Sequence, residues 1–417
     1  MKLVTQIRLL PTPEQAAALD VTLRRCNEAA TWASGIAFEK DTRRNFPLRK
    51  LVYGEMRTRW GLGSQAAQHV IKKTCDAYAV LGASLKAGNL GKPGSKRHRK
   101  AVGKPIVFRS EGAQPFDDRM LSWQIEERRV SIWTVAGRLK DVAITAGPDQ
   151  LAVLSLYRKG ESDLVRRDGM WFLYATCEIP DVEPNADPVD FVGVDLGIVN
   201  IATTSDGEVM AGRELSRSRV RERKLRAKLH HKNTASTKRR LKKRRRKEAR
   251  RATDINHKIA KRVVAEAERT GRGIALEDLT GIRERVRLRK PQRATHSSWA
   301  FAQLGAFIAY KARRAGVPVM YVDPAFTSRT CAECGCIDRA NRVSQARFVC
   351  RSCGFVDHAD RNSSRNIRAR AWELWRRGAR STAPAPSPRQ RGEAGRKRSA
   401  AASGARCASL GAIVLGG

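Results

Sequence analysis

Three acidic residues stand where regular secondary structure is expected to end or begin. Asp195 closes the apolar run FVGVD, Glu277 closes the run GIALE, and Asp360 opens the helix-like segment DRNSSRNIRARA. A carboxylate in so apolar a setting costs free energy unless its charge is compensated, and a divalent cation is the strongest compensation. Carboxylates from distant segments also suit a two-metal phosphodiester site, where one ion activates water and the other stabilises the leaving oxygen. The pattern therefore predicts a shared metal site.

Each of these carboxylates also has a simpler explanation when it is taken alone. An Asp between a strand and a turn, such as Asp195 before Gly197, is commonly a turn residue. Asp278, directly after Glu277, is the rival of Glu277, and a turn or helix-capping role is its alternative. The repetition of one pattern in three distant segments favours the shared site.

Five cysteines are crowded into one short stretch. Cys331 and Cys334 form a Cys-x-x-Cys pair, and fifteen residues later Cys350 and Cys353 form a second one, with Cys336 left over. This is the spacing of a four-thiolate zinc ribbon, and four buried free cysteines would not explain the pairing. Because four sulfurs close a tetrahedral site, the predicted zinc ion is structural and carries no catalysis.

The stretch between the first two acidic residues is strongly basic. From Lys238 to Arg251 only Glu248 opposes the cations, and sparse apolar residues predict two helices with a polar hinge at 233–236. Charges so dense repel one another unless a polyanion neutralises them, which favours phosphates of RNA or DNA over a solvated helix face. The cations expected to bind are Lys238, Arg239, Arg240, Lys242, Lys243, Arg244, Arg245, Arg246 and Lys247.

The same bias extends over the whole chain. Lys and Arg number 82 against 41 Asp and Glu, which gives a net charge of +41 in 417 residues. Such a protein binds polyanions and loses them as salt rises. The sequence has no run of about 20 apolar residues to span a bilayer, and its N-terminus has no apolar signal-peptide core. We therefore expect a cytoplasmic, nucleoid-associated protein without a membrane partner, whose cysteines are thiols or metal ligands.

The elements that carry these residues fall into two parts. Residues 1–10 alternate as a strand does, and so do the runs PIVFRS, LSWQI, RVSIWTV, DVAIT, AVLSLYRK and WFLYATCEI between 105 and 182. Together they predict one small β-barrel. Apolar residues at helical spacing, beginning at 14–40, predict a helical insertion, 11–104, in that barrel. Its Gly- and Lys-rich end, 86–104, is either a solvated loop or a phosphate contact.

The motifs of the C-terminal part match those of a known family. VGVDLG with Asp195, ALEDLTG with Glu277, the lead-in FTSRTCAECG and the D-R-N of Asp360 resemble the RuvC motifs and zinc ribbon of TnpB. TnpB is an RNA-guided nuclease of insertion sequences, and the miniature type V CRISPR effector nucleases share these motifs. The resemblance covers residues 1–375 and is strongest from residue 191. One departure is Ser363–Ser364, where the family more often has alanines.

The resemblance implies a multidomain α+β fold. Asp195 would bridge two Mg²⁺ or Mn²⁺ ions, Glu277 would hold one of them and Asp360 the other. The expected domains are a wedge-like β-barrel (1–10 and 105–182), an inserted helical recognition domain (11–104), an RNase H-like (RuvC) nuclease domain (189–326 and 358–376), an inserted zinc ribbon (327–357) and, by composition, a disordered tail (378–417).

The function that the resemblance implies is guided cleavage of double-stranded DNA. A monomer in a ribonucleoprotein would find its target by guide RNA pairing and a short flanking motif. The alternatives are a miniature CRISPR effector, a guided binder without cleavage, a transposase in its own right and a zinc-ribbon module without catalysis. A binder is expected to lack an acidic ligand, and all three are present here.

Overall fold

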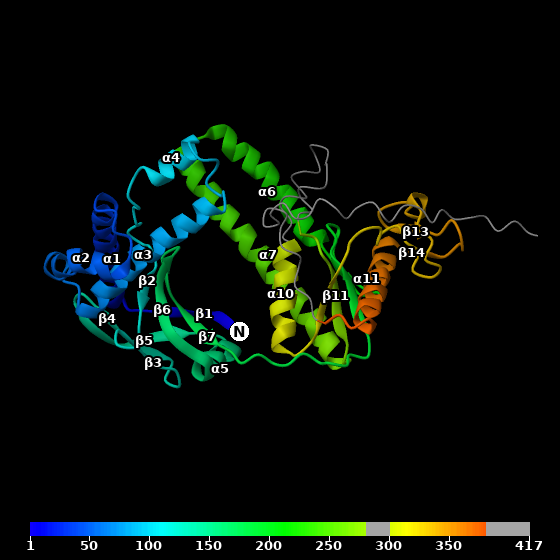
Figure 1. Cartoon of the computed structure of the whole chain (residues 1–417), viewed down its shortest axis with the longest axis horizontal. Helices are drawn as coiled ribbons and strands as arrows, with labels where there is room; N and C mark the ends of the chain where they lie inside the picture. The colour runs from blue at the N-terminus through cyan, green and yellow to red at the C-terminus, as the bar shows by residue number, and fades with distance from the viewer. Residues whose placement is uncertain (281–300, 381–417) are drawn as a thin grey trace, which may run out of the picture. The chain divides into compact units, whose positions relative to one another are not determined.

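The protein is described here by a computed structural model that covers residues 1–280 and 301–380. The chain divides into two compact units, Met1–Pro180 and Asp181–Gly417, and Figure 1 shows the elements of each. In the described ranges no helix has the length and apolar character that a membrane crossing requires. The predicted disordered tail lies, from residue 381 onward, outside the described residues.

Unit 1 is built on a seven-stranded, nearly closed sheet. The N-terminal strand lies in the middle of it and pairs antiparallel with β7 on one side and β5 on the other. The expected barrel is therefore a nearly closed sheet, with β2 and β3 at its two edges. In spatial order the strands are β2 (Gln114–Phe116), β6 (Arg158–Arg167), β7 (Met170–Glu178), β1 (Lys2–Leu10), β5 (Gly137–Thr145), β4 (Arg129–Thr134) and β3 (Leu121–Gln124).

All but the last of the helices of unit 1 lie between β1 and β2, as the spacing of apolar residues predicts. The first of them starts at a capping box, in which Thr12 and Gln15 satisfy each other's backbone amides. Its buried face joins the core formed by the sheet and the next two helices. The helices are α1 (Pro13–Glu39), α2 (Asn45–Trp60), α3 (Ser64–Lys86), α4 (Lys96–Val102) and α5 (Pro148–Tyr157).

Two runs that were expected to be strands are not, so these predictions were wrong. The run PIVFRS is irregular because the amides of Ile106 and Phe108 donate to side chains of α1 instead of to a neighbouring strand. Most of AVLSLYRK lies in α5, which starts at Pro148 with a side-chain cap from Gln150. A short apolar run can suit a buried helix as well as a strand, and its alternation alone does not separate the two.

Unit 2 is built on a five-stranded sheet in the order β10-β9-β8-β11-β12, in which β8, β11 and β12 run parallel. Helix α11 covers one face, and α7 and α10 cover the other (Figure 1). The elements of this unit are β8 (Phe191–Asp195), β9 (Asn200–Thr204), β10 (Val209–Ala211), α6 (Arg213–Lys232), α7 (Ala235–Arg269), β11 (Gly273–Glu277), α10 (Phe301–Arg314), β12 (Val319–Val322) and α11 (Ala359–Arg376). The predictions of β8, β11, the two basic helices α6 and α7, and the helix α11 are confirmed, whereas β10 and α10 were not predicted.

A small subdomain lies between β12 and α11 and holds the paired cysteines. It contains the two-stranded sheet β13 (Arg347–Val349) with β14 (Val356–His358) and a short 3₁₀ helix, Arg339–Asn341. Its core is Cys331, Cys350 and Phe348 packed with Ala359. So small an apolar core cannot by itself stabilise a fold, which is why domains of this size commonly use a metal.

Candidate functional site: three carboxylates beside a cysteine cluster

Two of the predicted acidic residues lie side by side at the carboxyl edge of the unit 2 sheet. Strands β8 and β11 are parallel neighbours, and their register pairs Val194 with Leu276. The next residues along the two strands are Asp195 and Glu277, so both strands end in a carboxylate at the same edge. The apolar part of each strand is buried and fixes this register.

The third acidic residue comes to the same edge on α11. Asp360 is in the first turn of that helix and is 9% exposed. The helix crosses β8 so closely that a Cβ placed on Gly193 would lie 2.0 Å from the carbonyl oxygen of Ser364. Asp360 Oδ2 is also close to the turn after Asp195, because it lies 3.9 Å from a Cβ placed on Gly197. Because Gly193 has no side chain, α11 can pack closely against β8, and this close packing brings Asp360 to the edge of the sheet.

The electrostatics show that the three carboxylates share one environment. Burial is the main cause that holds the pKa of Asp195 well above its usual value, and the negative charges of Glu277 and Asp360 add to it. Burial also raises the pKa of Glu277, although a hydrogen bond from Thr327 opposes the shift. Charges buried together in this way repel one another and favour the binding of a cation.

Several partners of these carboxylates were not found from the sequence. Thr327 Oγ1 donates to Glu277 Oε1 from the loop after β12. Asn200 Nδ2 donates to Asp360 Oδ2 over 3.0 Å, and Arg342 Nη2 lies 3.3 Å from Asp360 Oδ1. The Arg342 charge also lowers the pKa of Asp195 and of Glu277. Asn200 and Thr327 occur inside the motifs VGVDLGIVN and FTSRT, whereas Arg342 enters the site only because the cysteine subdomain folds back toward α11.

Glu277 and Asp278, the two candidates for the second acidic ligand, have different hydrogen-bond partners in the structure. The Glu277 carboxylate accepts from Thr327, whereas the Asp278 carboxylate accepts from the backbone amide of Thr280 over 3.0 Å. Asp278 thus caps the turn that follows β11. This hydrogen bond supports the turn-capping role that was the alternative interpretation of Asp278.

The donor set suits a hard divalent cation such as Mg²⁺ or Mn²⁺. Such ions prefer carboxylate oxygens, and the buried negative charge around Asp195 is destabilising until it is neutralised. In the described ranges, the cysteine quartet is the one set of three or more metal-ligating side chains with all donor atoms within 4.8 Å. Asp360 is held by a hydrogen bond from Asn200 and by the nearby guanidinium of Arg342.

The four predicted cysteines converge on one point. The Sγ atoms of Cys331 and Cys353 are 3.7 Å apart, and those of Cys334 and Cys350 are 3.5 Å apart. Four sulfurs around a zinc ion with Zn–S bonds of about 2.3 Å would be separated by about 3.8 Å along each tetrahedral edge. The observed distances fit such a quartet closely.

Two buried asparagines tie this subdomain to α11. Asn362 accepts from the amide of Ala332 over 2.9 Å and donates to the carbonyl of Thr330 over 2.8 Å. Asn366 donates to the carbonyls of Thr327 and Thr330. Because Asp360 lies on the same helix, the cysteine cluster and the carboxylates are parts of one rigid assembly.

Two protein-family models match the segments that hold the acidic residues and the cysteines. Residues 174–280 match the OrfB_IS605 model, described as "Probable transposase", and residues 301–367 match the "Cas12f1-like, TNB domain" model. The first match holds Asp195 and Glu277, and the second holds Asp360 and the cysteines. Over these segments the chain is similar to TnpB-like and Cas12f1 proteins.

Individual relatives of the TnpB and Cas12f1 type agree with this assignment. A TnpB-like protein of Methanocaldococcus jannaschii is 41% identical over 23% of this chain and 35% of its own length. The CRISPR-associated endodeoxyribonuclease Cas12f1 of Sulfoacidibacillus thermotolerans is 38% identical over 27% of this chain and 25% of its own length. An Escherichia coli K12 protein named "Putative RNA-guided DNA endonuclease InsQ" is 27% identical over 48% of this chain and 54% of its own length. The chain thus spans between a quarter and about half the length of these curated relatives.

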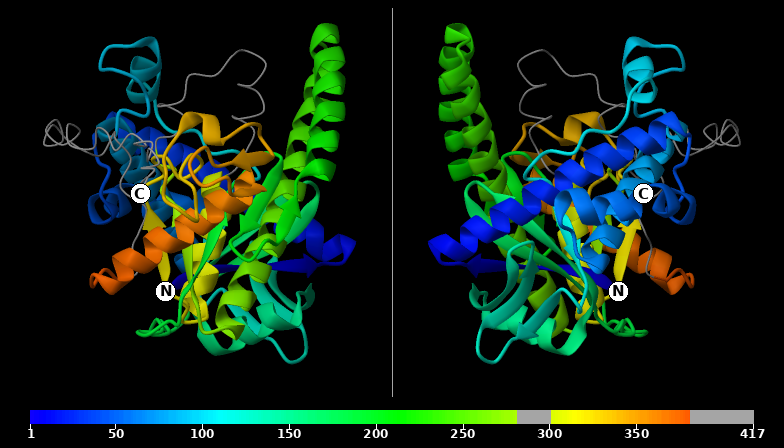
Figure 2. Two further views of the ribbon diagram at one scale, coloured as in Figure 1. Left: turned by 90° about the vertical axis from the view of Figure 1, so that its right-hand side faces the viewer. Right: turned by 90° about the vertical axis from the view of Figure 1, so that its left-hand side faces the viewer.

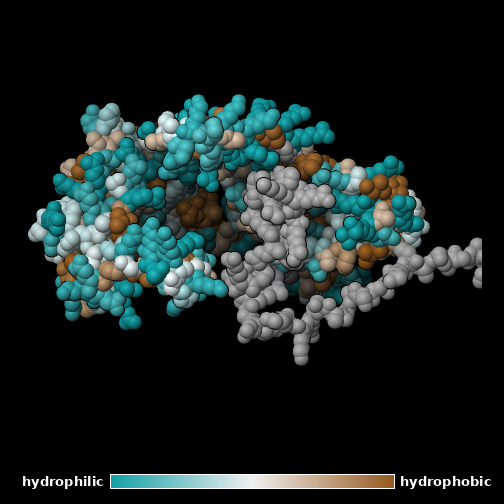
Figure 3. Space-filling view, turned by 90° about the horizontal axis from the view of Figure 1, so that it is seen from above, coloured by the Kyte–Doolittle hydropathy of each residue, from teal (hydrophilic) through white to brown (hydrophobic). Residues whose placement is uncertain are grey.

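Unit 2 also carries the predicted basic residues, on a helical hairpin. Helices α6 and α7 lie side by side (Figures 1 and 2), joined by a turn in which Asn233 has a φ of 44°. Arg244 forms an ion pair with Glu222 on α6 at 2.6 Å, so it braces the hairpin. Hydrophilic side chains dominate the surface over α6 and α7 in Figure 3. The exposed cations are Lys238, Arg239, Arg240, Lys242, Lys243, Arg245 and Lys247, whereas Arg244 and Arg246 are half-buried.

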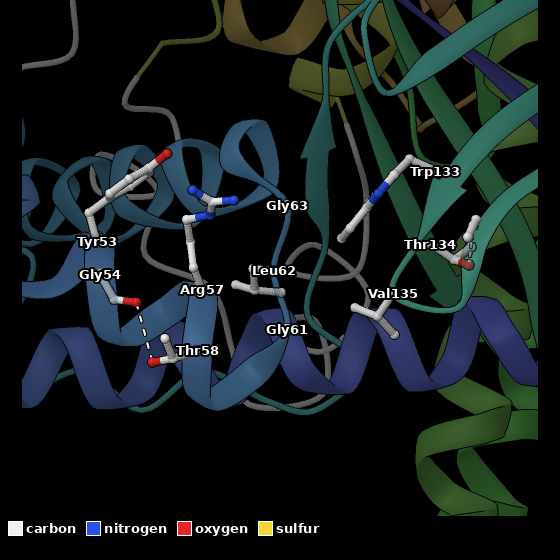
Figure 4. Close-up of a pocket in the computed structure, with 11 residues that line it drawn as sticks. Tyr53, Gly54, Arg57, Thr58, Gly61, Leu62, Gly63, Trp133, Thr134 and Val135 are labelled. Atoms are coloured by element: carbon white, nitrogen blue, oxygen red, sulfur yellow. Dashed lines mark hydrogen bonds between the residues drawn. The ribbon is translucent and has the colours of Figure 1, made fainter.

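Unit 1 contains a pocket that the sequence did not indicate. It encloses about 690 Å³ between α2, the turn before α3, and the β4–β5 hairpin. Figure 4 shows Tyr53, Arg57 and Trp133 among its lining side chains. The Arg57 guanidinium lies 5.9 Å from the centre of the Tyr53 ring. Aromatic rings next to cations are features of surfaces that stack nucleobases.

Proposed function

We propose that this chain is an RNA-guided DNA endonuclease of a transposable element, whose cleavage depends on divalent metal ions. The convergence of Asp195, Glu277 and Asp360 at one edge of the unit 2 sheet carries this proposal. Two of them end adjacent parallel strands, and the third begins the helix that crosses those strands. The names of the relatives, which include an endodeoxyribonuclease and a "Putative RNA-guided DNA endonuclease", support it independently.

The chain's own residues would prepare the site for phosphodiester hydrolysis. Divalent ions, when bound, would supply an activated water and stabilise the leaving oxygen. Asp195 would contact both ions, with Glu277 on one and Asp360 on the other. Thr327 orients the Glu277 carboxylate through its hydroxyl, and Arg342 places a positive charge beside Asp360. That positive charge can balance excess negative charge when a phosphate enters the site.

We further propose the domain assignment that the family resemblance implied. In unit 2, residues 189–326 and 358–376 would form the RuvC, RNase H-like nuclease domain, and residues 327–357 the zinc ribbon with one structural Zn²⁺. The three parallel strands β8, β11 and β12, with helices on both faces, support this view. In unit 1, the sheet would be the wedge barrel, and residues 11–104 the recognition helices inserted into it.

Guide RNA and double-stranded target DNA are the proposed partners of a monomeric protein. The net charge of +41 supports polyanionic partners, and the exposed cations of α7 supply an extended phosphate-binding surface. The pocket of Tyr53, Arg57 and Trp133 supplies a second surface, suited to bases as well as phosphates. The similarity to a CRISPR-associated Cas12f1 keeps a miniature CRISPR effector as the alternative context.

One experiment tests guidance and cleavage together. The full-length protein is purified with the RNA that accompanies it, the RNA is sequenced, and plasmids with matching or scrambled target sequences beside a randomised flank are offered with Mg²⁺. We expect cleavage of the matching plasmid alone, within a restricted set of flanks. Cleavage that ignores the RNA sequence would contradict guidance, and a complex that binds the matching plasmid without cutting it would favour the non-cleaving binder.

A further inference from the structure

Phe326 is an exposed aromatic residue on a strained stretch of backbone, and it directly precedes Thr327, which contacts the carboxylate site. Phe326 is 49% exposed and has a φ of 63°. A left-handed backbone is uncommon outside glycine, and for a bulky residue it is a marked outlier. Such a conformation costs folding free energy and persists only where the surrounding structure enforces it. Glycine at this position would relieve the strain, so the phenyl ring needs another explanation.

The surrounding structure does enforce this conformation. Arg370 Nη1 donates to the carbonyls of Asp323 and Ala325, both over 2.7 Å. Asn366 Nδ2 holds the carbonyls of Thr327 and Thr330 from the same helix. The loop is thus fixed to α11 on both sides of Phe326. The Phe326 carbonyl itself accepts from the amides of Arg329 and Thr330, so the ring is carried by a rigid support.

The ring is attached to the chain close to the carboxylate site. Thr327, the next residue, is 2% exposed, and its hydroxyl donates to Glu277. Consecutive Cα atoms are about 3.8 Å apart, so the ring is attached one residue from a direct partner of the site. Two cations are found here, Arg329, which is exposed on the same loop, and Arg370, which anchors the loop, against one exposed carboxylate, Asp323. An exposed ring in a cationic setting suits a nucleobase, whose face stacks on the ring while its phosphates are neutralised.

We propose that Phe326 is a substrate-positioning residue that stacks on an unpaired base of the DNA strand next to the bond to be cleaved. This inference rests on the proposed nuclease function and adds to it a specific contact for the substrate strand. Stacking needs an exposed base face, so the contact would favour single-stranded DNA over duplex. A rigid ring also fixes the register of the strand, because a base held on it sets which phosphate reaches the carboxylates.

The test measures stacking separately from cleavage. Full-length protein carrying Asp195→Ala is mixed with single-stranded DNA in which 2-aminopurine replaces one base at a time, and fluorescence quenching reports stacking on a ring. We expect a restricted set of positions to be quenched by the parent protein. Phe326→Gly should remove that quenching and weaken oligonucleotide binding by about 5- to 150-fold, while Phe326→Tyr should keep both.

Matched measurements separate a stacking role from a structural one. Phe326→Gly should keep or raise the thermal midpoint, because glycine accepts the left-handed backbone without strain. Val356→Ala, at an exposed apolar residue of the same unit, should leave the quenching unchanged. Quenching that survives in Phe326→Gly, or that no position shows with the parent protein, would overturn the stacking proposal. Failure of the nuclease proposal is a distinct result, namely no Mg²⁺-dependent cleavage by a protein with Asp195 and Phe326 intact.

Discussion

Asp195 illustrates how a functional residue can work against the stability of the chain that carries it. Its pKa is raised by burial and then by the charges of Glu277 and Asp360, so the folded protein pays for ionising it. Between the usual pKa of 3.8 and the raised value, the folded state binds more protons than the unfolded state. The stability of the metal-free protein therefore falls as pH rises through this window and stays reduced above it.

We expect Asp195→Asn to stabilise the metal-free protein at neutral pH. The amide keeps the shape of the side chain and removes the charge that burial and two neighbouring carboxylates oppose. The gain is expected in the free energy of unfolding, because a raised pKa means that ionising Asp195 destabilises the folded state. Thermal melts with and without Mg²⁺ measure it, and Mg²⁺ should stabilise the wild type more than the variant. A metal-free variant that melts below the wild type would contradict this account of Asp195.

The site residues differ in how far the sequence could predict them. Asp195 and Glu277 could be predicted because an apolar strand that ends in a carboxylate has a recognisable local sequence pattern. Asp360 could be predicted because the start of a helix also has such a pattern. Arg342 could not be predicted from the sequence, because its place depends on how the cysteine subdomain folds back on α11. Phe326 could not be predicted either, since its residue type does not indicate a left-handed backbone. Local patterns predict positions on elements, whereas tertiary packing decides which side chains share a site.

At the scale of elements, the approach of α11 to β8 is the feature that assembles the site. We expect Gly193→Ala to destabilise the protein by about 1–3 kcal/mol and to reduce cleavage, since its Cβ would lie 2.0 Å from the Ser364 carbonyl oxygen. The helix would have to move away and take Asp360 with it. Urea unfolding and cleavage rates are the measurements.

Gly305→Ala is the matched control for this change. Gly305 lies inside α10, and nothing lies within 4 Å of a Cβ placed there. Alanine should therefore stabilise the helix by about 0.5–1 kcal/mol without affecting cleavage. Equal effects of the two substitutions would show that the close approach at Gly193 is unimportant.

The cysteine subdomain is predicted to depend on its metal. We expect Cys350→Ser to lower the zinc content from about one ion per chain toward none and to lower the thermal midpoint, because loss of one thiolate opens a closed site. Metal analysis by mass spectrometry measures the first effect. Cys75→Ser, at a half-buried free cysteine of unit 1, should keep the zinc. Unchanged zinc content in Cys350→Ser would refute the assignment of the quartet.

Secondary structure was predicted less well in unit 1 than in unit 2. Alternating apolar residues predicted strands at PIVFRS and AVLSLYRK, but an irregular segment and α5 were found. Strand β6 was not predicted because its residues, RKGESDLVRR, are largely polar. In unit 2 the runs FVGVD and GIALE are almost fully buried, and the strand predicted at each was confirmed. Alternation is a weak signal in strands of a half-exposed sheet, whereas a continuous apolar run predicted the strands of the buried sheet.

At the scale of the whole molecule, charge governs how the protein meets nucleic acid. The triple change Lys242→Gln, Lys243→Gln and Arg245→Gln removes exposed cations of α7. If each one neutralises a phosphate, the slope of log affinity against log salt should fall by about 2–3 for duplex DNA. Fluorescence anisotropy across a salt series measures the slope.

Arg244→Gln provides the comparison for that triple change. Arg244 is engaged with Glu222 on the neighbouring helix, so its loss should loosen the α6–α7 hairpin and change the slope by less than about 0.5. An unchanged slope in the triple variant would mean that these cations face no phosphate.

The central claim is that the carboxylates of Asp195, Glu277 and Asp360 form one metal-dependent cleavage centre. Its most direct test is a Mg²⁺ titration of guided plasmid cleavage by the wild type, Asp195→Ala, Glu277→Ala, Asp360→Ala and, as the neighbouring control, Asp278→Asn. We predict cleavage that EDTA abolishes, loss of cleavage by at least about 100-fold in each of the three alanine variants with target binding kept, and near-normal cleavage by Asp278→Asn. An alanine variant that cuts at the wild-type rate, or wild-type cutting that persists in EDTA, would contradict the account.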